Sequence, residues 1–288
     1  MNVLVTGATG NVGLEVIEQL VMKNSGNKIV AGVRNVERAK SQHPTIKEID
    51  CVLFDFEEPR TFDLALAGVD IIFLLRPPHI ANIKKYFGPL IATISSKKIS
   101  KIVFLSVQGA EASTLIPHRK IELAIIKTGI DHVFLRPSYF MQNLTTTLAK
   151  EIKIRRSITL PSADAKFNWI DVHDIAELAV EFIEKFDEYK NRSFTISGSE
   201  NLNFETVVKR INAIAGTNIS YYSVGPFGYW KLKKEEGLVS GMIMVTFLLH
   251  FLPRMQTEPE IVNSFQDILK KAPGSLNSFI ARNVQFFT

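Results

Sequence analysis

The sequence is poor in cysteine and contains no apolar run long enough to cross a membrane. Cys51 is the only cysteine among 288 residues, so no intrachain disulfide can form and a disulfide scaffold is excluded. The most apolar stretch, from Leu238 to Leu252, contains polar side chains and is followed by Pro253. A bilayer-spanning helix needs about 20 apolar residues. This stretch therefore predicts a buried or lobe-capping helix, with an oligomer contact as the alternative.

Charge of one sign is not concentrated anywhere in the chain. The formal net charge is +5, but basic residues are scattered among acidic ones, and the densest basic group spans residues 150–156. This pattern is typical of a solvated face, so no nucleic-acid partner is predicted. The first residues carry neither a basic leader nor an apolar signal core, so the expected location is the cytoplasm, without a membrane partner.

Apolar runs alternate with segments of helical periodicity over the first 136 residues. Short continuous apolar runs of this kind are typical of parallel strands that are covered on both faces. The predicted strands are 2–6, 28–33, 49–54, 70–75, 101–106 and 132–136, and the helices between them include 11–23, 81–97 and 117–127. The alternation predicts right-handed βαβ crossovers in an α/β, doubly wound Rossmann sheet.

The alternation becomes irregular beyond residue 137, where aromatic residues are more frequent. One short strand is predicted over 157–160, and helices are predicted over 139–148, 174–186, 204–215, 239–252, 258–271 and 275–283. We therefore expect an NAD(P)-binding Rossmann domain over residues 1–150. Residues 151–288 are expected to supply the remaining sheet elements and a smaller, mostly helical, substrate-binding lobe.

A glycine-rich turn joins the first predicted strand to the first predicted helix. Gly7, Gly10 and Gly13 have the spacing G-x-x-G-x-x-G. Gly7 and Gly10 are expected to adopt positive φ and to bring backbone N–H groups close to a pyrophosphate. The helix that begins near Asn11 directs its positive dipole end at the anion, and Gly13 lets this helix pack closely on the sheet. In a βαβ unit this turn predicts a dinucleotide site, with a purely structural turn as the alternative.

The residues after the second and third predicted strands indicate which dinucleotide is bound. Arg34 lies where a Rossmann protein reads the adenosine ribose. An acidic residue there would favour NAD, whereas the guanidinium suits a 2′-phosphate, so NADP(H) is predicted in preference to NAD(H). An exposed arginine without a ligand is the alternative. Asp55 and Phe56 follow the third strand and are expected to border the adenine, although Asp55 could instead cap a helix.

Together these motifs resemble the NmrA-like family of the atypical short-chain dehydrogenase/reductase superfamily. This group includes quinone oxidoreductase-like reductases and redox-sensing regulators, and some relatives are labelled nucleoside-diphosphate-sugar epimerase. The resemblance spans nearly the whole chain. It rests on residues 6–13, 33–35, 105–106, His118 with Glu122, 135–144, 169–176 and 273–279.

The resemblance implies a set of cofactor-binding residues. They are Gly7, Thr9, Gly10, Asn11 and Val12 at the pyrophosphate, Arg34 at the 2′-phosphate, Asp55 and Phe56 at the adenine, Leu74, Leu75 and Arg76 beside the ribose, and Ser106 and Pro137 at the nicotinamide.

Typical reductases of the superfamily use a tyrosine and a lysine four positions later, and this chain lacks that pair. His118 stands in the place of the tyrosine and Glu122 in the place of the lysine. His118 could donate a proton near neutral pH, with Glu122 one helical turn away to orient or charge it. A histidine that touches only backbone or solvent is the alternative. Hydride transfer to a quinone needs less assistance than reduction of a ketone, so catalysis is not excluded.

Side chains of the second half, most of them aromatic, are candidates for an apolar cleft over the nicotinamide, with core packing as the alternative for each. They are Tyr139, Phe140, Asn143, Trp169, Phe227, Tyr229 and Trp230. The predicted function is an NADP(H)-binding oxidoreductase that reduces a quinone or a similar small electron-poor acceptor. The alternatives are a non-catalytic NADP(H)-dependent redox sensor that binds a protein partner and, ranked last, an epimerase-like enzyme. No metal is expected, and a homodimer remains open.

Overall fold

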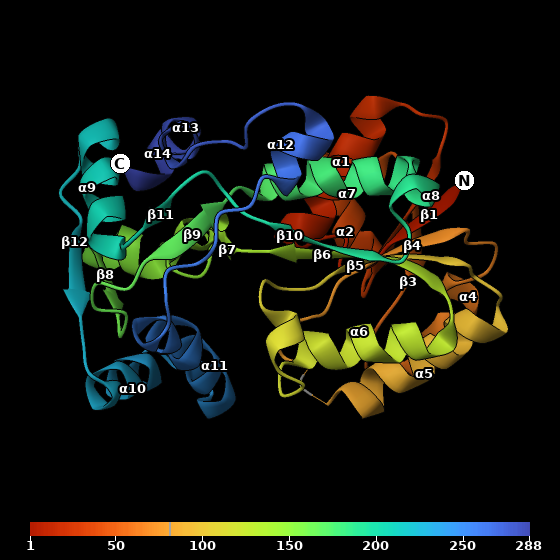
Figure 1. Cartoon of the computed structure of the whole chain (residues 1–288), viewed down its shortest axis with the longest axis horizontal. Coiled ribbons are helices and arrows are strands. Elements are labelled where there is room, and N and C mark those ends of the chain that lie inside the picture. The colour runs from red at the N-terminus through yellow and green to blue at the C-terminus, as the bar shows by residue number, and fades with distance from the viewer. Residues whose placement is uncertain (81) are drawn as a thin grey trace. The chain divides into compact units, whose positions relative to one another are not determined.

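The computed structural model describes residues 1–80 and 82–288, and the chain divides into two compact units. The first unit comprises Met1–Pro137 and Val172–Ile196, and the second comprises Ser138–Asp171 and Ser197–Thr288 (Figure 1). The sequence prediction placed a single boundary near residue 150. The structure instead returns residues 172–196 to the first unit, because a helix and a strand in this segment pack onto its sheet.

The first unit is built around a parallel sheet with the strand order β10-β6-β5-β4-β1-β2-β3. The strands are β1 (Asn2–Val5), β2 (Lys28–Val33), β3 (Asp50–Leu53), β4 (Ile71–Leu74), β5 (Lys101–Leu105), β6 (Asp131–Pro137) and β10 (Arg192–Ile196). The order reverses between β1 and β4, which is the topological switch point of a doubly wound sheet. The predicted α/β Rossmann fold is confirmed.

Helices cover both faces of this sheet, so its central strands are buried. The first unit contains α1 (Asn11–Lys23), α2 (Val36–Gln42), α3 (Pro44–Lys47), η1 (Pro59–Thr61), α4 (Phe62–Ala65), α5 (Ile83–Ser96), η2 (Ala110–Ala112), α6 (Pro117–Thr128), α7 (Val172–Glu184) and α8 (Phe186–Tyr189). Helices α1 and α7 pack together on one face, and α5 and α6 pack together on the other (Figure 1). The predicted helix 81–97 is found as α5, and its expected start at Ala81 lies outside the described residues.

The second unit combines short strands with helices. Its strands are β7 (Tyr139–Phe140), β8 (Ser157–Leu160), β9 (Phe167–Ile170), β11 (Asn201–Leu202) and β12 (Ser220–Ser223), paired in the orders β11-β9-β7 and β12-β8. Its helices are η3 (Met141–Leu144), η4 (Glu151–Arg155), α9 (Phe204–Ala215), α10 (Pro226–Glu235), α11 (Ser240–Phe251), η5 (Leu252–Met255), α12 (Ser264–Leu269), α13 (Leu276–Arg282) and α14 (Val284–Phe287). Among the residues that the structure describes, no helix has the length and apolarity that a bilayer crossing requires.

Two predicted helices of the second unit are wrong over part of their length. The segment 139–148 opens with β7, because Tyr139 and Phe140 pair with the end of β9. The segment 258–271 is helical only over α12. Pro259 disfavours helical backbone at Glu258, and the chain has no regular structure from there to Asn263.

Candidate functional site

The glycine-rich turn is closed by backbone contacts. Gly7 follows β1 with a φ of +60°, a conformation that favours glycine. The Gly10 amide donates to the Gly7 carbonyl oxygen at 2.9 Å. The predicted positive φ at Gly10 is wrong: its φ is −88°, because it serves as the N-cap of α1, and N-cap residues have extended backbone.

The start of α1 lies so close to the glycine-rich segment that Cβ atoms at positions 10 and 13 would be crowded. A Cβ atom at Gly13 would lie 2.3 Å from the Gly7 carbonyl oxygen, and one at Gly10 would lie 3.2 Å from the same atom. As a glycine, the N-cap has no side chain with which to cap the helix. The amides of Asn11, Val12 and Gly13 precede the first residue that can donate within the helix. The geometry is therefore a cradle of backbone N–H groups at the positive end of a helix.

The predicted cofactor residues follow the carboxyl ends of neighbouring strands in this unit. Gly7 follows β1, Arg34 follows β2, Leu75 follows β4 and Ser106 follows β5. Since these strands are parallel and adjacent in the sheet, their carboxyl ends lie at one edge. Thr6 ties two of the ends together, because its hydroxyl accepts from the Leu75 amide at 2.9 Å. This edge contains the switch point, where ligands of doubly wound sheets bind.

Arg34 presents an exposed positive charge at this edge of the sheet. The next residue, Asn35, caps α2 by accepting a hydrogen bond from the Arg38 amide at 2.9 Å, so Arg34 lies just outside the helix. Across residues 1–80 and 82–288, no carboxylate forms an ion pair with Arg34. Its guanidinium is therefore available to an anionic ligand.

Asp55 and Phe56 are held by the fold. Asp55 accepts a hydrogen bond from the Glu57 amide at 2.9 Å, which is an Asx turn and not a helix cap. Phe56 is 5% exposed, with its ring centroid 5.0 Å from those of Phe54 and Phe87. The Phe56 ring thus belongs to the core of the first unit, and only its backbone is left to border a ligand.

Arg76 organises the loop after β4. Its guanidinium donates to the carbonyl oxygens of Pro77, Pro78 and Ile80, at 2.7 to 3.2 Å. Its Nε donates to Nε2 of His118 at 3.3 Å. Leu74 before it is fully buried, and the side chain of Leu75 occupies the space beside Gly7. Arg76 therefore holds the loop and the Nε2 edge of the His118 ring.

His118 is a neutral imidazole at physiological pH. Burial lowers its pKa, the neighbouring charge of Arg76 lowers it further, and the resulting pKa is about 3. The ring centroid lies 6.2 Å from that of Phe104. Because Nε2 accepts the hydrogen bond from Arg76, this nitrogen carries no proton. The structure gives no support to His118 as a proton donor near neutral pH.

Glu122 forms hydrogen bonds with residues other than its predicted partner, His118. It is fully buried and accepts hydrogen bonds from Ser106 at 2.7 Å, from Arg136 at 2.8 and 2.9 Å, and from Arg119 at 3.0 Å. Burial acts to raise the pKa of this carboxyl group, but the three donors outweigh it and hold the pKa below its ordinary value of 4.5. Glu122 therefore anchors α6 to the ends of β5 and β6 and does not orient His118.

Replacing Glu122 with glutamine is expected to lower the free energy of unfolding at neutral pH by about 1.5–3 kcal/mol, the scale of a charge-assisted hydrogen bond. The folded-state pKa lies below 4.5, so the ionised carboxylate contributes its full stability above that pH and loses it as the pH falls through the folded value. Urea unfolding at neutral and acidic pH should therefore show the largest difference between wild type and variant at neutral pH.

Glu111 provides the matched control, because it also pairs with Arg136, at 2.9 Å, but its side chain is 51% exposed. An exposed ion pair contributes about 0–1 kcal/mol, so Glu111→Gln should change stability little. Equal losses in the two variants would show that burial of Glu122 adds nothing.

The predicted substrate residues do not gather in one cleft of the second unit. Trp169 is fully buried, and its Nε1 donates to the Leu202 carbonyl oxygen at 3.0 Å. Phe227, in contrast, is 93% exposed at the start of α10. Trp230 is partly buried against the aromatic core of this unit. Phe140 and Asn143 are also partly exposed.

Tyr139 is bonded to a histidine that sequence reasoning missed. The Nδ1 of His250 lies 2.7 Å from the Thr246 carbonyl oxygen, which can only accept, so Nδ1 carries the proton. Nε2 then accepts from the Tyr139 hydroxyl at 2.9 Å. Burial lowers the pKa of His250 to about 4. Its sequence signal was weak, because it is one polar residue in the apolar stretch of α11.

Comparison with known proteins assigns the chain to a family. The sequence model described as the NmrA-like family matches residues 1–242. The chain belongs to the NmrA-like family. Prestalk A differentiation protein A of Dictyostelium discoideum is 33% identical over 240 residues, covering 83% of this NmrA-like chain and 77% of that protein. NAD(P)H azoreductase of Xenophilus azovorans is 26% identical over 278 residues, covering 94% and 93%.

Solved structures share the fold of this NmrA-like protein. Triphenylmethane reductase of Citrobacter sp. superposes with a TM-score of 0.85 at 19% identity, covering 99% of this chain and 100% of that chain. An NADPH-dependent quinone oxidoreductase of Escherichia coli, solved with NADPH, gives 0.84 at 18% identity, covering 97% and 99%. The predicted family is confirmed.

Proposed function

We propose that this NmrA-like protein is an NADP(H)-dependent oxidoreductase that reduces a quinone or a similar small electron-poor acceptor by hydride transfer. The observation that carries the proposal is the backbone cradle at Gly7–Gly13, with the exposed Arg34 at the same sheet edge. Such a site suits a pyrophosphate together with a separate 2′-phosphate on the adenosine ribose.

The residues of the cradle fit a dinucleotide. Cβ atoms at Gly10 and Gly13 would crowd the Gly7 carbonyl oxygen, so glycine at these positions lets α1 begin close to the turn, with its free N–H groups toward the ligand. Gly7, Thr9, Gly10, Asn11 and Val12 would hold the pyrophosphate, and Arg34 the 2′-phosphate. The loop ends at Asp55, Leu75, Arg76, Ser106 and Pro137 would flank the rest of the cofactor. When bound, NADPH supplies the hydride. Relatives described as an NAD(P)H azoreductase and an NADPH-dependent quinone oxidoreductase support this assignment.

The chemistry of the chain favours an acceptor that needs no strong acid from the protein. His118 is neutral and bonded to Arg76, and the carboxylate of Glu122 is fully engaged by Ser106 and two arginines. Neither residue is suited to protonate a ketone in the way that a tyrosine–lysine pair does. A quinone gains electrons readily, and water can protonate the reduced ring. We therefore assign His118 and Arg76 to positioning.

The cofactor cradle with Arg34, together with the lack of a suitable acid at His118 and Glu122, also favours a second candidate function. This is a redox sensor that binds NADP(H) without turnover and responds to it through a protein partner. A sensor needs the cradle and Arg34 but no general acid. The two functions differ in whether bound NADPH is consumed.

The deciding experiment mixes the purified full chain with NADPH and menadione, benzoquinone or cyclohexanone, and follows NADPH absorbance. We expect turnover on the order of 1 per second or faster with at least one quinone and none with the ketone. NADPH binding in parallel calorimetry without oxidation by any quinone would overturn the reductase and leave the sensor. In a separate reaction with UDP-glucose, conversion of the sugar would support the epimerase-like alternative.

A further inference from the structure

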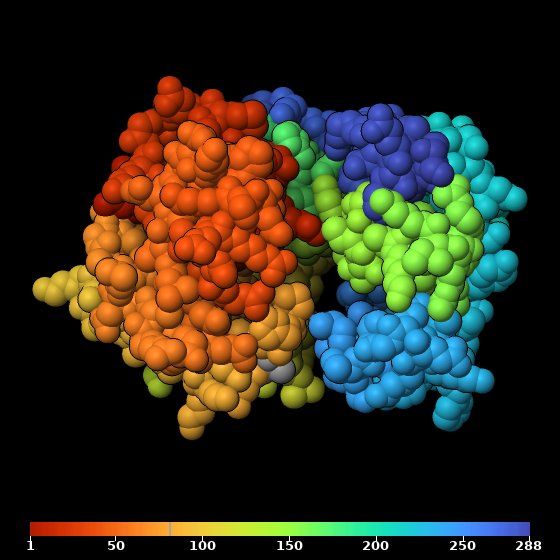
Figure 2. All heavy atoms as spheres, turned by 180° about the vertical axis from the view of Figure 1, so that it is seen from behind, coloured from red at the N-terminus to blue at the C-terminus, as the bar shows by residue number. Residues whose placement is uncertain are grey.

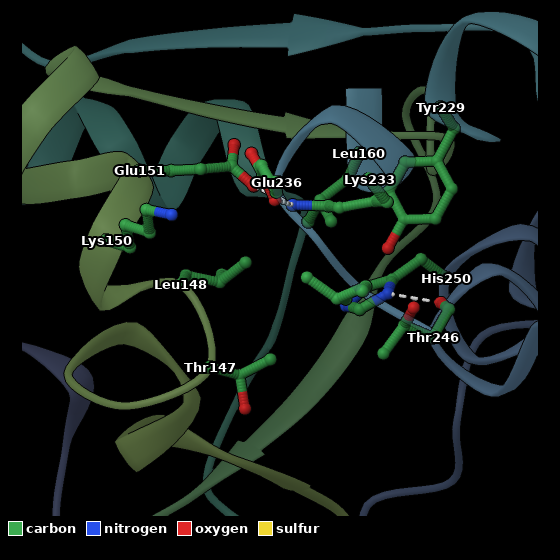
Figure 3. Close-up of a pocket in the computed structure, with 11 residues that line it drawn as sticks. Thr147, Leu148, Lys150, Glu151, Leu160, Tyr229, Lys233, Glu236, Thr246 and His250 are labelled. Atoms are coloured by element: carbon green, nitrogen blue, oxygen red, sulfur yellow. Dashed lines mark hydrogen bonds and ion pairs between the residues drawn. The ribbon is translucent and has the colours of Figure 1, made fainter. Parts of the chain in front are cut away.

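The second unit contains a cavity of about 100 Å³ that no part of the proposed function uses. It lies between η4, β8, α10 and α11 (Figure 3). Its lining consists of Thr147, Leu148, Lys150, Glu151, Leu160, Tyr229, Lys233, Glu236, Leu238, Thr246 and His250. From the side shown in Figure 2, a hollow separates the yellow-green segment near residue 150 from the blue segment of α10 and α11.

A buried ion cluster forms one wall of the cavity. Lys233 is 6% exposed and forms ion pairs with Glu151 and with Glu236, the latter at 3.0 Å. Glu236 also pairs with Arg155 at 2.8 Å, and Glu151 accepts from the Thr159 amide at 2.8 Å. Burial acts to lower the pKa of Lys233, but the two carboxylates raise it above its ordinary value. Two cations thus balance two carboxylates, so the wall is charged but neutral in sum.

The remaining walls are mainly apolar. Leu148 and Leu160 are buried, and Leu238 is partly buried. The Lys233 ammonium group lies 5.6 Å from the centroid of the Tyr229 ring. Thr147 and Lys150, which are exposed, mark the edge that faces solvent. A flat apolar group can therefore contact leucine and tyrosine on several sides.

One hydrogen-bond donor of the cluster is left for a ligand. An ammonium group has three N–H bonds. In the part of the chain that the structure describes, Lys233 donates to two carboxylates and to no third oxygen. The ring nitrogens of His250 are both engaged, by Thr246 and Tyr139. Within the ion cluster, Lys233 therefore has one N–H bond that an oxygen atom in the cavity can accept.

We propose that this cavity binds a small neutral ring that carries a hydroxyl or carbonyl oxygen, with the oxygen accepting from Lys233 and the ring packed on Leu148, Leu160 and Tyr229. The carboxylates of the cluster are already paired with Lys233 and Arg155, so a charged ligand would lose its hydration without gaining an unpaired counter-charge there and is disfavoured. The volume of about 100 Å³ is smaller than the roughly 150 Å³ of an apolar cavity that encloses benzene in another protein, so the ring would enter edge first and leave its far side at the exposed rim formed by Thr147 and Lys150.

The test is a calorimetric titration of the full chain, without dinucleotide, with p-cresol, toluene and p-toluate. We expect saturable one-to-one binding of p-cresol. Toluene, which lacks the oxygen, should bind about tenfold more weakly, as expected for loss of a hydrogen bond to a charged donor. The negatively charged p-toluate should bind more weakly than either. Absence of saturable p-cresol binding, or equal affinity for p-cresol and p-toluate, would overturn the proposal.

Leu160→Phe is expected to fill the cavity and abolish p-cresol binding. Leu202→Phe is its control, because Leu202 is also a buried strand leucine of the second unit but does not line the cavity. If Leu160→Phe does not fold, Thr147→Trp at the exposed edge serves instead. Unchanged p-cresol affinity in a folded cavity variant would also overturn the proposal. No dinucleotide takes part, so this failure would leave the proposed reductase untouched.

Discussion

Replacing Arg34 with alanine is expected to weaken NADP⁺ binding by about 10- to 100-fold, the scale of hydrogen bonds to a charged group. NAD⁺ binding should change little, because NAD⁺ has no 2′-phosphate. Arg34 is exposed at the end of β2 and forms no ion pair within residues 1–80 and 82–288, so its removal leaves no buried charge behind. The NADP⁺ affinity of Arg34→Lys should lie between those of the wild type and Arg34→Ala, since lysine keeps the charge but lacks the planar guanidinium group.

The measurement is calorimetry with both dinucleotides at one fixed ionic strength, because salt screens exposed charges. Arg192→Ala is the matched control: Arg192 is also an exposed arginine of this sheet, but it begins β10 and so lies at the opposite end of a strand. It should leave both affinities unchanged. Equal losses of NADP⁺ and NAD⁺ affinity in Arg34→Ala would mean that Arg34 does not read the 2′-phosphate.

Replacing Gly13 with alanine is expected to abolish most binding of both dinucleotides. The new Cβ would lie 2.3 Å from the Gly7 carbonyl oxygen and 3.1 Å from the Ala8 Cα, which are backbone atoms that cannot rotate away. The turn or α1 must then shift. Overpacking of this kind costs about 1–3 kcal/mol of stability. Loss of two amide contacts to a pyrophosphate should weaken binding about 100-fold.

Urea unfolding and calorimetry measure the two effects separately. Gly241→Ala is the control, because Gly241 is exposed in α11 and a Cβ there would meet no atom within 4 Å in the described part of the chain. It should keep or slightly increase stability, since alanine favours helix. Gly13→Ala with unchanged affinity for either dinucleotide would show that the cradle does not hold the pyrophosphate.

The two variants together separate the parts of the cofactor. Arg34→Ala should change the preference between NADP⁺ and NAD⁺, whereas Gly13→Ala should weaken both and leave the preference intact. A protein in which neither change affects binding would support neither the reductase nor the sensor.

The sequence by itself determined residues 1–137 of the first unit and the edge of its sheet that carries the glycine-rich turn, but not the return of residues 172–196 to this unit. Continuous apolar runs predict strands covered on both faces, and the glycine spacing predicts a turn in which backbone atoms approach closely. Each of these patterns lies within a few consecutive residues, so the sequence alone shows it. Arg34 could be placed for the same reason, because the end of β2 follows from the run that precedes it. The assignments failed where local preference was overruled, as at Gly10, which caps α1, and over 139–148, which pairs with β9.

Only the tertiary structure decided the state of the ionisable groups. His118 was an apparent acid until the fold placed Arg76, 42 positions away, against its Nε2. Glu151 stood in a basic segment expected to be solvated, yet it is buried against Lys233, 82 positions away. A pKa and a cavity both depend on which distant side chains exclude water from a group and which donate to it, and local periodicity does not encode those partners.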